Sequence, residues 1–414
     1  MNAVAEVEVS EHVTGAREAA PDRRAYRMAS IDILRGLVIV VMALDHVRDF
    51  MMIGSTQDPT SDPQAGVLLF MTRWVTHLCA PTFVFLSGVS AGLMAHRKNQ
   101  TDLARFLLLR GLWLIGLEVL VVSTAWSFSP LGIAELGGRT PIGLQVLWAI
   151  GASMIVLAAA QYLGPRACLA IGIAIICGHN LLDAVWPPGS TVAAQKPLWG
   201  LVHARQVYDV GPFSIYFSYP LLPWIGVMLL GYASAPIFQG PTKLRDARLI
   251  RIGTGLLLAF VALRLLDSYG DPRQWRHDPN SVAATVMSFL ATTKYPPSLL
   301  YLLMTLGLAA IICRYAERLR GGIRHALMTF GRAPLAFYVA HLYLIHGAAI
   351  LLGIAQGFQP EQLLTHYRYF PKGFGVGLGT VYLMWIAVVV LLYPLCRWVA
   401  ALKARRTDWW LSYV

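Results

Sequence analysis

Residues 30–53 read SIDILRGLVIVVMALDHVRDFMMI, an apolar run with charged residues near both of its ends. About 20 consecutive apolar residues cross a bilayer as one helix, and runs of this length recur along the chain. They are too long and too continuous to be barrel strands. We therefore expect an all-α fold, a polytopic membrane helix bundle with partly ordered extracytoplasmic loops. The ten expected spans cover residues 30–53, 66–95, 103–123, 141–162, 166–185, 216–238, 250–269, 296–316, 326–354 and 375–402.

The composition indicates a chain that is solvated mainly by lipid. Hydrophobic residues make up 56% of the 414 residues and charged residues 14%, against about 25% charged residues in soluble domains. The mean hydropathy is +0.56. These values argue against a soluble enzyme, a disordered protein and a nucleic-acid-binding domain. The five cysteines lie in apolar stretches without a CxxC pattern, so we expect buried free thiols.

Lysine and arginine are distributed unevenly between the two sides that ten spans define. With the N-terminus in the cytoplasm, the inner segments hold 20 of these residues and the outer loops hold 8. The positive-inside rule then places both termini in the cytoplasm and accounts for the net charge of +12 without nucleic acid. We expect a flexible cytoplasmic tail (1–28), a transmembrane domain (29–403) and a cytoplasmic C-terminal tail (404–414). The longer loops at 124–140, 186–215, 270–295 and 355–374 should form a cap over the outer face.

Ionisable residues gather at the outer end of the first expected helix, in ALDHVRDF at 43–50. His46 and Asp49 are three residues apart, as are Asp45 and Arg48, so each pair can meet on one helix face. Asp49 can accept a hydrogen bond from one ring nitrogen of His46, which leaves the other nitrogen as a general base. The alternative is that these residues form only a salt-bridged helix end at the membrane interface.

The second and ninth expected helices carry further polar residues inside the membrane. Arg73 and His77 are four residues apart on the second helix, and Tyr338 and His341 are three apart on the ninth. His341 and His46 are expected at a similar height in the bilayer, so they can share a cavity. For each histidine the alternative is a hydrogen bond between helices. No HExxH pattern is present, and we expect no metal.

Two more pairs have the spacing of neighbours on one helix face. They are Asp32 with Arg35, near the cytoplasmic end of the first helix, and Arg264 with Asp267, near the outer end of the seventh. Charged groups inside a membrane are costly unless they are paired. We interpret both pairs as structural.

The start of the first helix, SIDILRGLVIVVMALDH at 30–46, resembles the integral-membrane sugar O-acyltransferases of acyltransferase family three. The resemblance lies in the IDxLRG motif and in a histidine 14 residues after the aspartate. Further motifs are similar, in order, to bacterial membrane proteins of the heparan-α-glucosaminide N-acetyltransferase-like family. They are RWVTHLCAPTFVFLSG, RGLWLIGLE, LQVLWAIG, YPLLPWIGVMLLGY, KYPPSLLYLLMTLG and GRAPLAFYVAHLYLIH. This resemblance extends over residues 27–402.

The resemblance implies an acyl-CoA donor from the cytoplasm, an active site within the membrane and a saccharide acceptor on the far side. His46 matches the first-helix histidine of the O-acyltransferases. The animal N-acetyltransferases have asparagine there and use a histidine in the following loop, whereas residues 51–65 here contain none. This difference favours His46 as the base and sets the acceptor apart from heparan glucosamine. His77 stands where the animal enzymes have an acidic residue.

We predict an acyl-CoA-dependent acyltransferase that moves an acyl group, acetyl in the first instance, to a saccharide or similar cell-envelope acceptor. The predicted catalytic residues are His46, Asp49, His77 and His341, and the predicted substrate-binding residues are Asp45, Arg48, Arg73 and Tyr338. Acetyl-CoA or another acyl-CoA is the expected co-substrate, and no cofactor is expected to stay bound. The predicted residues for its phosphates are Arg97, Lys98, Arg110 and Arg332.

The alternative function is a proton-coupled transporter of a small solute, because intramembrane histidine and aspartate also form proton relays. The sequence shows no internal repeat of the kind that many transporters have. We expect the protein in the bacterial cytoplasmic membrane. Its expected partners are the lipid bilayer, an acyl-CoA and the acceptor, with no nucleic acid and with a possible second copy in a homodimer.

Overall fold

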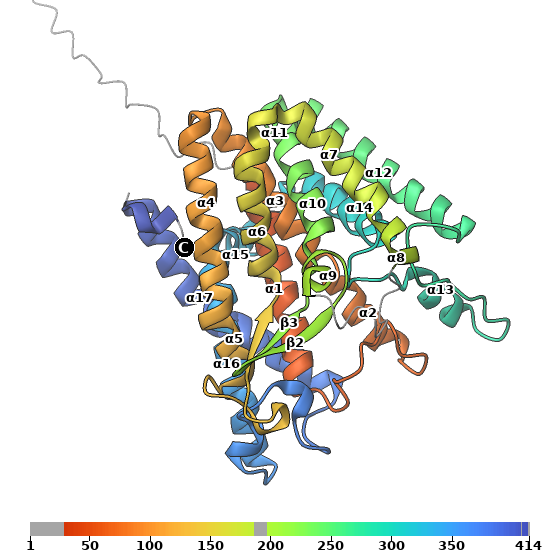
Figure 1. The fold of residues 1–414 in the computed structure, drawn as a ribbon, viewed down its shortest axis with the longest axis vertical. Coiled ribbons are helices and arrows are strands. Elements are labelled where there is room, and N and C mark those ends of the chain that lie inside the picture. The colour runs from red at the N-terminus through yellow and green to blue at the C-terminus, as the bar shows by residue number, and fades with distance from the viewer. Residues whose placement is uncertain (1–28, 186–196, 407, 413–414) are drawn as a thin grey trace, which may run out of the picture.

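The computed structural model describes residues 29–185, 197–406 and 408–412 of the chain, which form a helical bundle with one small sheet (Figure 1). The expected N-terminal tail, residues 1–28, lies outside the described residues. Helix α1 (Ala29–Met51) passes through the middle of the bundle, where it contacts α2, α3, α14, α15, α16 and α17. Most of its residues are buried, which lets it carry charged side chains through an apolar region.

The bundle is built from helices that correspond to the ten expected apolar runs. They are α2 (Val67–Thr76), α3 (Cys79–Ala95), α4 (Gln100–Leu117), η1 (Glu118–Val122), α5 (Ser123–Ser127), α6 (Val146–Ala160), α7 (Gly164–Gly178), α8 (Leu182–Val185), α10 (Leu221–Ala233), α11 (Ala235–Gln239), α12 (Thr242–Leu266), α14 (Leu299–Ala316), α15 (Gly321–Arg332), α16 (Pro334–Ala355) and α17 (Leu378–Arg405), together with α1. Among the described residues, eight segments are long and apolar enough to cross a membrane. One of these, Val146–Val185, contains two of the expected runs, α6 and α7, which are separated by a turn at Gly164. Helix α1, the first expected span, is not among the eight.

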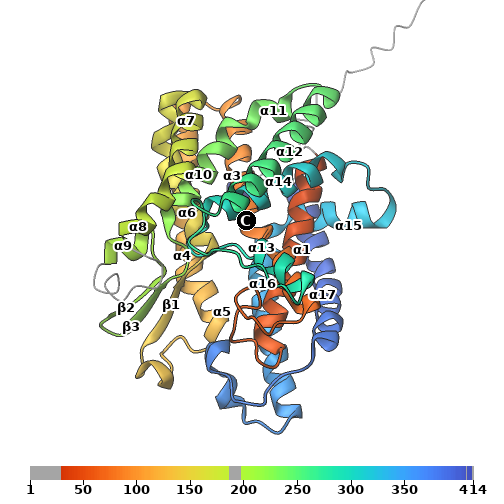
Figure 2. The same cartoon turned by 90° about the vertical axis from the view of Figure 1, so that its right-hand side faces the viewer.

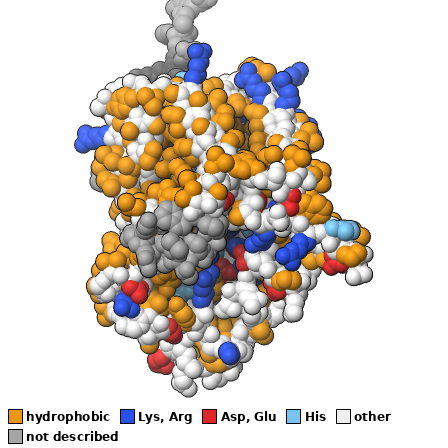
Figure 3. Space-filling model, turned by 45° about the vertical axis from the view of Figure 1, so that its right-hand side comes forward, with side chains coloured by type: hydrophobic (Ala, Val, Ile, Leu, Met, Phe, Trp, Pro, Cys, Tyr) orange, Lys and Arg blue, Asp and Glu red, His pale blue; other side chains and the backbone are white. Residues whose placement is uncertain are grey.

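Two ends of the bundle are distinguished by what lies there. The cap end is where α1 finishes at Met51 and where the sheet and the 356–377 segment lie (Figures 1 and 2). The basic end is where α3 gives way to α4, with Arg97 and Lys98 between them. Figure 3 shows a broad belt of hydrophobic side chains, bordered by Lys and Arg at its upper edge, and a hollow beneath it where charges of both signs gather. This distribution is that of a membrane-spanning protein.

The ninth expected run, 326–354, is not one tilted helix. Helix α15 ends at Arg332, Ala333 has a non-helical backbone (φ −126°, ψ 45°), and α16 begins at Pro334. A proline favours the first turn of a helix and disfavours helical geometry in the residue before it. As a result α15 projects sideways from the bundle (Figure 2), and α16 alone forms the span.

The second run is also interrupted, between α2 and α3 at His77 and Leu78. Pro81 has no backbone N–H to donate to the carbonyl of His77, four residues earlier. The hydroxyl of Tyr301, on α14, donates to that carbonyl instead, at 2.8 Å. The break therefore connects the α2–α3 segment to α14 by a hydrogen bond.

Three short strands form part of the cap, which the expectation of helices alone did not include. They are β1 (Thr140–Leu144), β2 (Gln206–Val210) and β3 (Phe213–Phe217), in the order β1-β3-β2. Strand β3 pairs in parallel with β1 and antiparallel with β2, and Gly211 turns the β2–β3 hairpin with φ of 54°. The other short cap elements include α9 (Pro197–Val202) and α13 (Val282–Leu290).

The two pairs interpreted as structural are present. Arg35 lies 3.3 Å from Asp32, and Arg264 lies 3.9 Å from Asp267. Arg264 is fully buried and also donates to four backbone carbonyls, those of Arg273, Ser288, Phe289 and Ala291. It therefore fastens α13 and its flanking loops to α12, because buried carbonyls need donors. The five cysteines are free, as expected, although Cys177 is exposed.

Helices α3 and α10 approach each other so closely that only glycine fits between them. A Cβ atom built on Gly88 would lie 2.2 Å from the carbonyl oxygen of Met228, and one on Gly231 would lie 2.2 Å from that of Phe85. Small residues four apart, here Gly88 and Gly92, favour such contacts between membrane helices. This contact fixes α3, which carries several residues of the candidate site.

We predict that Gly88→Leu lowers the thermal stability and folded yield of the purified protein, because the added side chain forces the two backbones apart. Gly116→Leu is the matched control, since nothing lies within 4 Å of a Cβ at Gly116 on α4. The measurements are the unfolding temperature in detergent and the monodisperse fraction in size-exclusion chromatography. Equal stability of the two variants would contradict the close α3–α10 contact.

Candidate functional site

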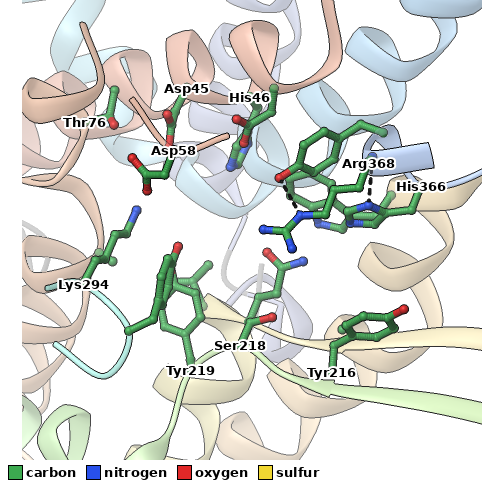
Figure 4. Close-up of a pocket in the computed structure, with 18 of the residues that line it drawn as sticks. Asp45, His46, Asp58, Thr76, Tyr216, Ser218, Tyr219, Lys294, His366 and Arg368 are labelled. Carbon is green, nitrogen blue, oxygen red and sulfur yellow. Dashed lines mark hydrogen bonds between the residues drawn. The ribbon is translucent and has the colours of Figure 1, made fainter. Parts of the chain in front are cut away.

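A cavity of about 420 Å³ opens between the last turns of α1 and the cap. We call it the cap cavity. Figure 4 shows side chains from distant parts of the chain that converge on it, including His46 from α1, Lys294 from the loop before α14, and Arg368 from the 366–369 segment. The sheet contributes Tyr216, and the residues after β3 contribute Tyr219. The loops thus complete a site whose floor is helical.

His46 and His341 are joined by a hydrogen bond inside the bundle. Nδ1 of His46 lies 2.7 Å from Nε2 of His341, and Nδ1 of His341 lies 3.0 Å from the carbonyl oxygen of Phe337. A carbonyl only accepts, so Nδ1 of His341 carries the proton and Nε2 of His341 accepts from Nδ1–H of His46. This assignment leaves Nε2 of His46 as an unprotonated nitrogen. His46 lines the cap cavity, whereas His341 is fully buried behind it.

The partner that orients His46 differs from the one that spacing predicted. Asp49 accepts a hydrogen bond from Nη2 of Arg48, and the ring of His46 is held by His341 instead. The prediction that Asp49 fixes the His46 tautomer is therefore corrected. The i, i+3 geometry allowed that contact, but the adjacent guanidinium attracts the carboxylate more strongly than a neutral imidazole does.

Five charged residues form a continuous ladder along the wall of the cap cavity. Arg48 pairs with Asp49 and, at 3.1 Å, with Asp45. Arg73 pairs with Asp45 and, at 3.0 Å, with Asp58. Burial opposes ionisation of Asp58, but the Arg73 guanidinium outweighs it and holds the pKa of that carboxyl well below its usual range. Both arginines are thereby largely neutralised by carboxylates, and they hold the α1 end, the 52–66 loop and α2 together.

His77 does not join the other two histidines. It is 1% exposed, it is absent from the lining of the cap cavity, and its ring packs edge-on against Tyr301 with 5.3 Å between the ring centroids. Arg73, four residues earlier, does line the cavity, so the two side chains do not share it as their spacing predicted. A catalytic role for His77 stays a prediction.

Several residues of the cap cavity were not singled out from the sequence. Lys294 is only 9% exposed and forms no ion pair with a carboxylate in the described part of the chain. Its ammonium lies 5.2 Å from the ring centroid of Tyr295, and Arg205 lies 4.9 Å from the same ring. Trp126 packs edge-on against His46, with 5.1 Å between centroids. Lys294, Tyr295 and Arg205 come from cap loops and Trp126 from the short helix α5. These segments show no periodicity that indicates which side chains turn inward; the one signal was that Lys294 opens the quoted KYPP motif.

His366 is a second histidine in the lining of the cap cavity. Burial lowers its pKa to about 3, and the Arg368 guanidinium acts in the same direction. Its Nδ1 accepts from the backbone N–H of Arg368 at 3.4 Å, and its ring stacks on Trp126. One of its ring nitrogens is thus already engaged by the cap backbone, whereas the ring of His46 is oriented by a second histidine inside the bundle. His46 is therefore the better candidate for a general base.

A second cavity, of about 740 Å³, opens at the basic end. We call it the basic cavity. All four residues predicted to bind the phosphates of an acyl-CoA line it, namely Arg97, Lys98, Arg110 and Arg332. Lysine and arginine side chains outnumber carboxylates in its lining. Phe106 lies between two of the cations, 5.8 Å from the ammonium of Lys98 and 5.9 Å from the guanidinium of Arg110.

The two cavities approach each other in the middle of the bundle. Among the described residues, four line both cavities: Met42, Phe83, Val146 and Tyr338. We call these four side chains the septum. Met42 lies one helical turn below His46 on α1, and Tyr338 lies three residues before His341 on α16. The histidine pair therefore stands directly beside the point where the cavities meet.

A comparison with known families identifies the family of the chain. Residues 27–263 match the family model described as heparan-alpha-glucosaminide N-acetyltransferase, catalytic. The chain belongs to this family. The expected family is thus confirmed, and with it a membrane acetyltransferase. The match includes His46 and ends before Tyr338 and His341. No curated protein matches the sequence.

We predict that His341→Phe lowers kcat about 10-fold or more, because Nδ1–H of His46 then loses its acceptor and the ring is no longer oriented. Asp49→Asn should have a clearly smaller effect, since an amide oxygen can still accept from Arg48. Initial rates with acetyl-CoA, and the pH profile of kcat, distinguish the two. A larger loss in Asp49→Asn than in His341→Phe would restore Asp49 as the orienting residue.

Proposed function

We propose that this acetyltransferase moves an acyl group, acetyl in the first instance, from a cytoplasmic acyl-CoA to a hydroxyl or amine of a saccharide or similar acceptor on the extracytoplasmic side. The observation that supports it is the meeting of two cavities, from opposite ends of the bundle, beside the His46–His341 pair. The protein would lie in the bacterial cytoplasmic membrane with both termini inside. The positive-inside rule supports this orientation, because the basic end then faces the cytoplasm.

The basic cavity suits an acyl-CoA in charge, shape and size. Its arginines and lysines can pair with the phosphates of the donor, and Phe106 offers a ring surface for the adenine. A volume of about 740 Å³ lies within the usual range for a ligand cavity. A donor anchored there can extend its pantetheine arm toward the septum, so that its thioester reaches the level of the histidine pair.

In the proposed reaction the acceptor enters the cap cavity and its hydroxyl or amine approaches Nε2 of His46. His46 takes the proton as the acceptor atom attacks the thioester carbon, and the C–S bond then breaks to release the CoA thiolate, which is protonated to the thiol. His341 keeps Nδ1–H of His46 hydrogen-bonded while the imidazole becomes an imidazolium. In this proposal the hydroxyl of Tyr338, which lines both cavities, donates to the oxyanion that forms on the carbonyl.

The ladder and the cap supply the acceptor site. The arginines of the ladder present a rigid polar wall, while Tyr216, Tyr219 and Trp126 present aromatic rings with polar edges. Such a mixture suits a molecule with many hydroxyl groups. A proton-coupled transporter would also need cavities at both ends and titratable groups between them. The preference for acyl transfer therefore rests on the family match, which is to an acetyltransferase.

We predict that His46→Ala lowers kcat about 10²–10⁴-fold, because the imidazole that acts as the base is removed. The protein should stay folded, because alanine is compatible with helix α1. The assay incubates purified protein with labelled acetyl-CoA and envelope glycans. His325→Ala, at the basic end on α15, controls for loss of an imidazole outside both cavities. An unfolded His46→Ala protein, or a folded one with full activity, would return His46 to the role of a helix-end residue.

We predict that Arg110→Gln combined with Arg332→Gln raises the KM for acetyl-CoA more than the KM for the acceptor, because phosphate contacts are lost. Arg251→Gln on α12 is the control, since Arg251 is exposed and outside the lining of both cavities. In sealed inside-out vesicles, acetyl-CoA added to the medium should be consumed without permeabilisation. A change confined to the acceptor KM would show that the sides are assigned the wrong way round.

A further inference from the structure

One face of α1 passes along both cavities in turn. Asp32, Arg35 and Ile39 line the basic cavity, Met42 lines both, and Asp45, His46 and Asp49 line the cap cavity. Helix α3 repeats this order, with Ser87 and Ser90 on the basic cavity, Phe83 on both, and Cys79 and Ala80 on the cap cavity. The cavities are therefore two halves of one track through the bundle, closed in the middle by the septum.

The septum is apolar except for one hydroxyl. Met42, Phe83 and Val146 present only hydrocarbon and sulfur, and Tyr338 presents its ring and hydroxyl. Met42, Val146 and Tyr338 are buried, and Phe83 is half-buried. Val146 is also fixed in place, because the carboxylate of Glu118 accepts hydrogen bonds from the next two backbone N–H groups, those of Leu147 (2.6 Å) and Trp148 (3.1 Å). The side chains of the septum are therefore packed against their surroundings, and the backbone next to Val146 is held by hydrogen bonds.

The geometry of thioester attack places the acyl chain against this element. The carbonyl carbon carries sulfur, oxygen and the acyl chain in one plane, and the nucleophile approaches from above that plane. In the proposed function the sulfur comes from the basic cavity and the nucleophile from the cap cavity. The oxygen and the acyl chain are then left to lie sideways among the four septum side chains, with the oxygen toward Tyr338 and the chain toward the apolar three.

We propose that Met42, Phe83 and Val146 set the length of the acyl chain that the protein transfers, and restrict it to acetyl and the next shortest chains. This inference rests on the proposed function. Each additional methylene must displace packed side chains, and one methylene in a fitted apolar pocket changes kcat/KM by about 10–200-fold. Phe83 is the main determinant, because it is the largest of the three apolar side chains and the only one of them that is half-buried, whereas the other two are buried.

The test measures kcat/KM for acetyl-, propionyl-, butyryl- and hexanoyl-CoA with one acceptor probe, glucosamine, which offers both an amine and hydroxyls. The native protein should favour acetyl over butyryl by about 10-fold or more. In Phe83→Ala the ratio of butyryl to acetyl should rise by about 10-fold or more, because the removed ring leaves room for the chain. Met42→Ala should shift the ratio in the same direction. Phe85→Ala, on the same helix but outside both cavity linings, should leave the ratio unchanged.

The outcomes separate this inference from the proposed function. Transfer of acetyl by the native protein with the same chain-length ratio in Phe83→Ala, Met42→Ala and Phe85→Ala overturns the septum as determinant and leaves the proposed function standing. No transfer of any acyl group by the folded native protein, to glucosamine or to envelope glycans, overturns both. If Phe83→Ala does not fold, Phe83→Leu and Val146→Ala give the same reading, since each removes volume from the septum with less disturbance.

Discussion

The hydrogen bond between His46 and His341 joins residues that are 295 positions apart, and the rest of the candidate site is arranged around it. It holds α1 and α16 at the height where the two cavities meet. It also settles which nitrogen of His46 is free, because the chain of donors ends on the carbonyl of Phe337. Without this bond the imidazole of His46 would have several orientations, and the septum would lose the fixed distance between two of its four walls.

The charged ladder reduces the energetic cost of placing ionised side chains near the membrane. Five ionised groups near a membrane interface are costly one by one, yet here every arginine lies between two carboxylates and every inner carboxylate lies beside an arginine. With three carboxylates and two guanidinium groups, the ladder has a formal charge of −1, so the positive charge of the cap cavity that is not offset within the ladder comes from Lys294, Arg205 and Arg368.

Much of the bundle could be predicted, because the need for about 20 apolar residues per span is strong and local. Pairs within one helix, such as Asp32–Arg35, could be predicted from residue spacing, which is also a local signal. The partner of His46 could not be predicted in this way, because spacing indicates contacts within a helix and His341 lies on another helix. Pro334 indicated a helix break at Ala333, but the length of the apolar run led to the prediction of one continuous span. Lys294 and Tyr219 lie in loops, where side-chain direction depends on tertiary packing alone.

The closed septum also has an electrical consequence. In the proposed reaction the proton leaves the acceptor on one side of the septum and the thiolate forms on the other. If His46 returns its proton across the septum to the sulfur, a turnover moves no charge through the membrane. If the proton instead escapes to the cap side, each turnover separates one elementary charge, which corresponds to about 2.3 kcal/mol per 100 mV of membrane potential. The dependence of turnover on an imposed potential in proteoliposomes would show which route the proton takes.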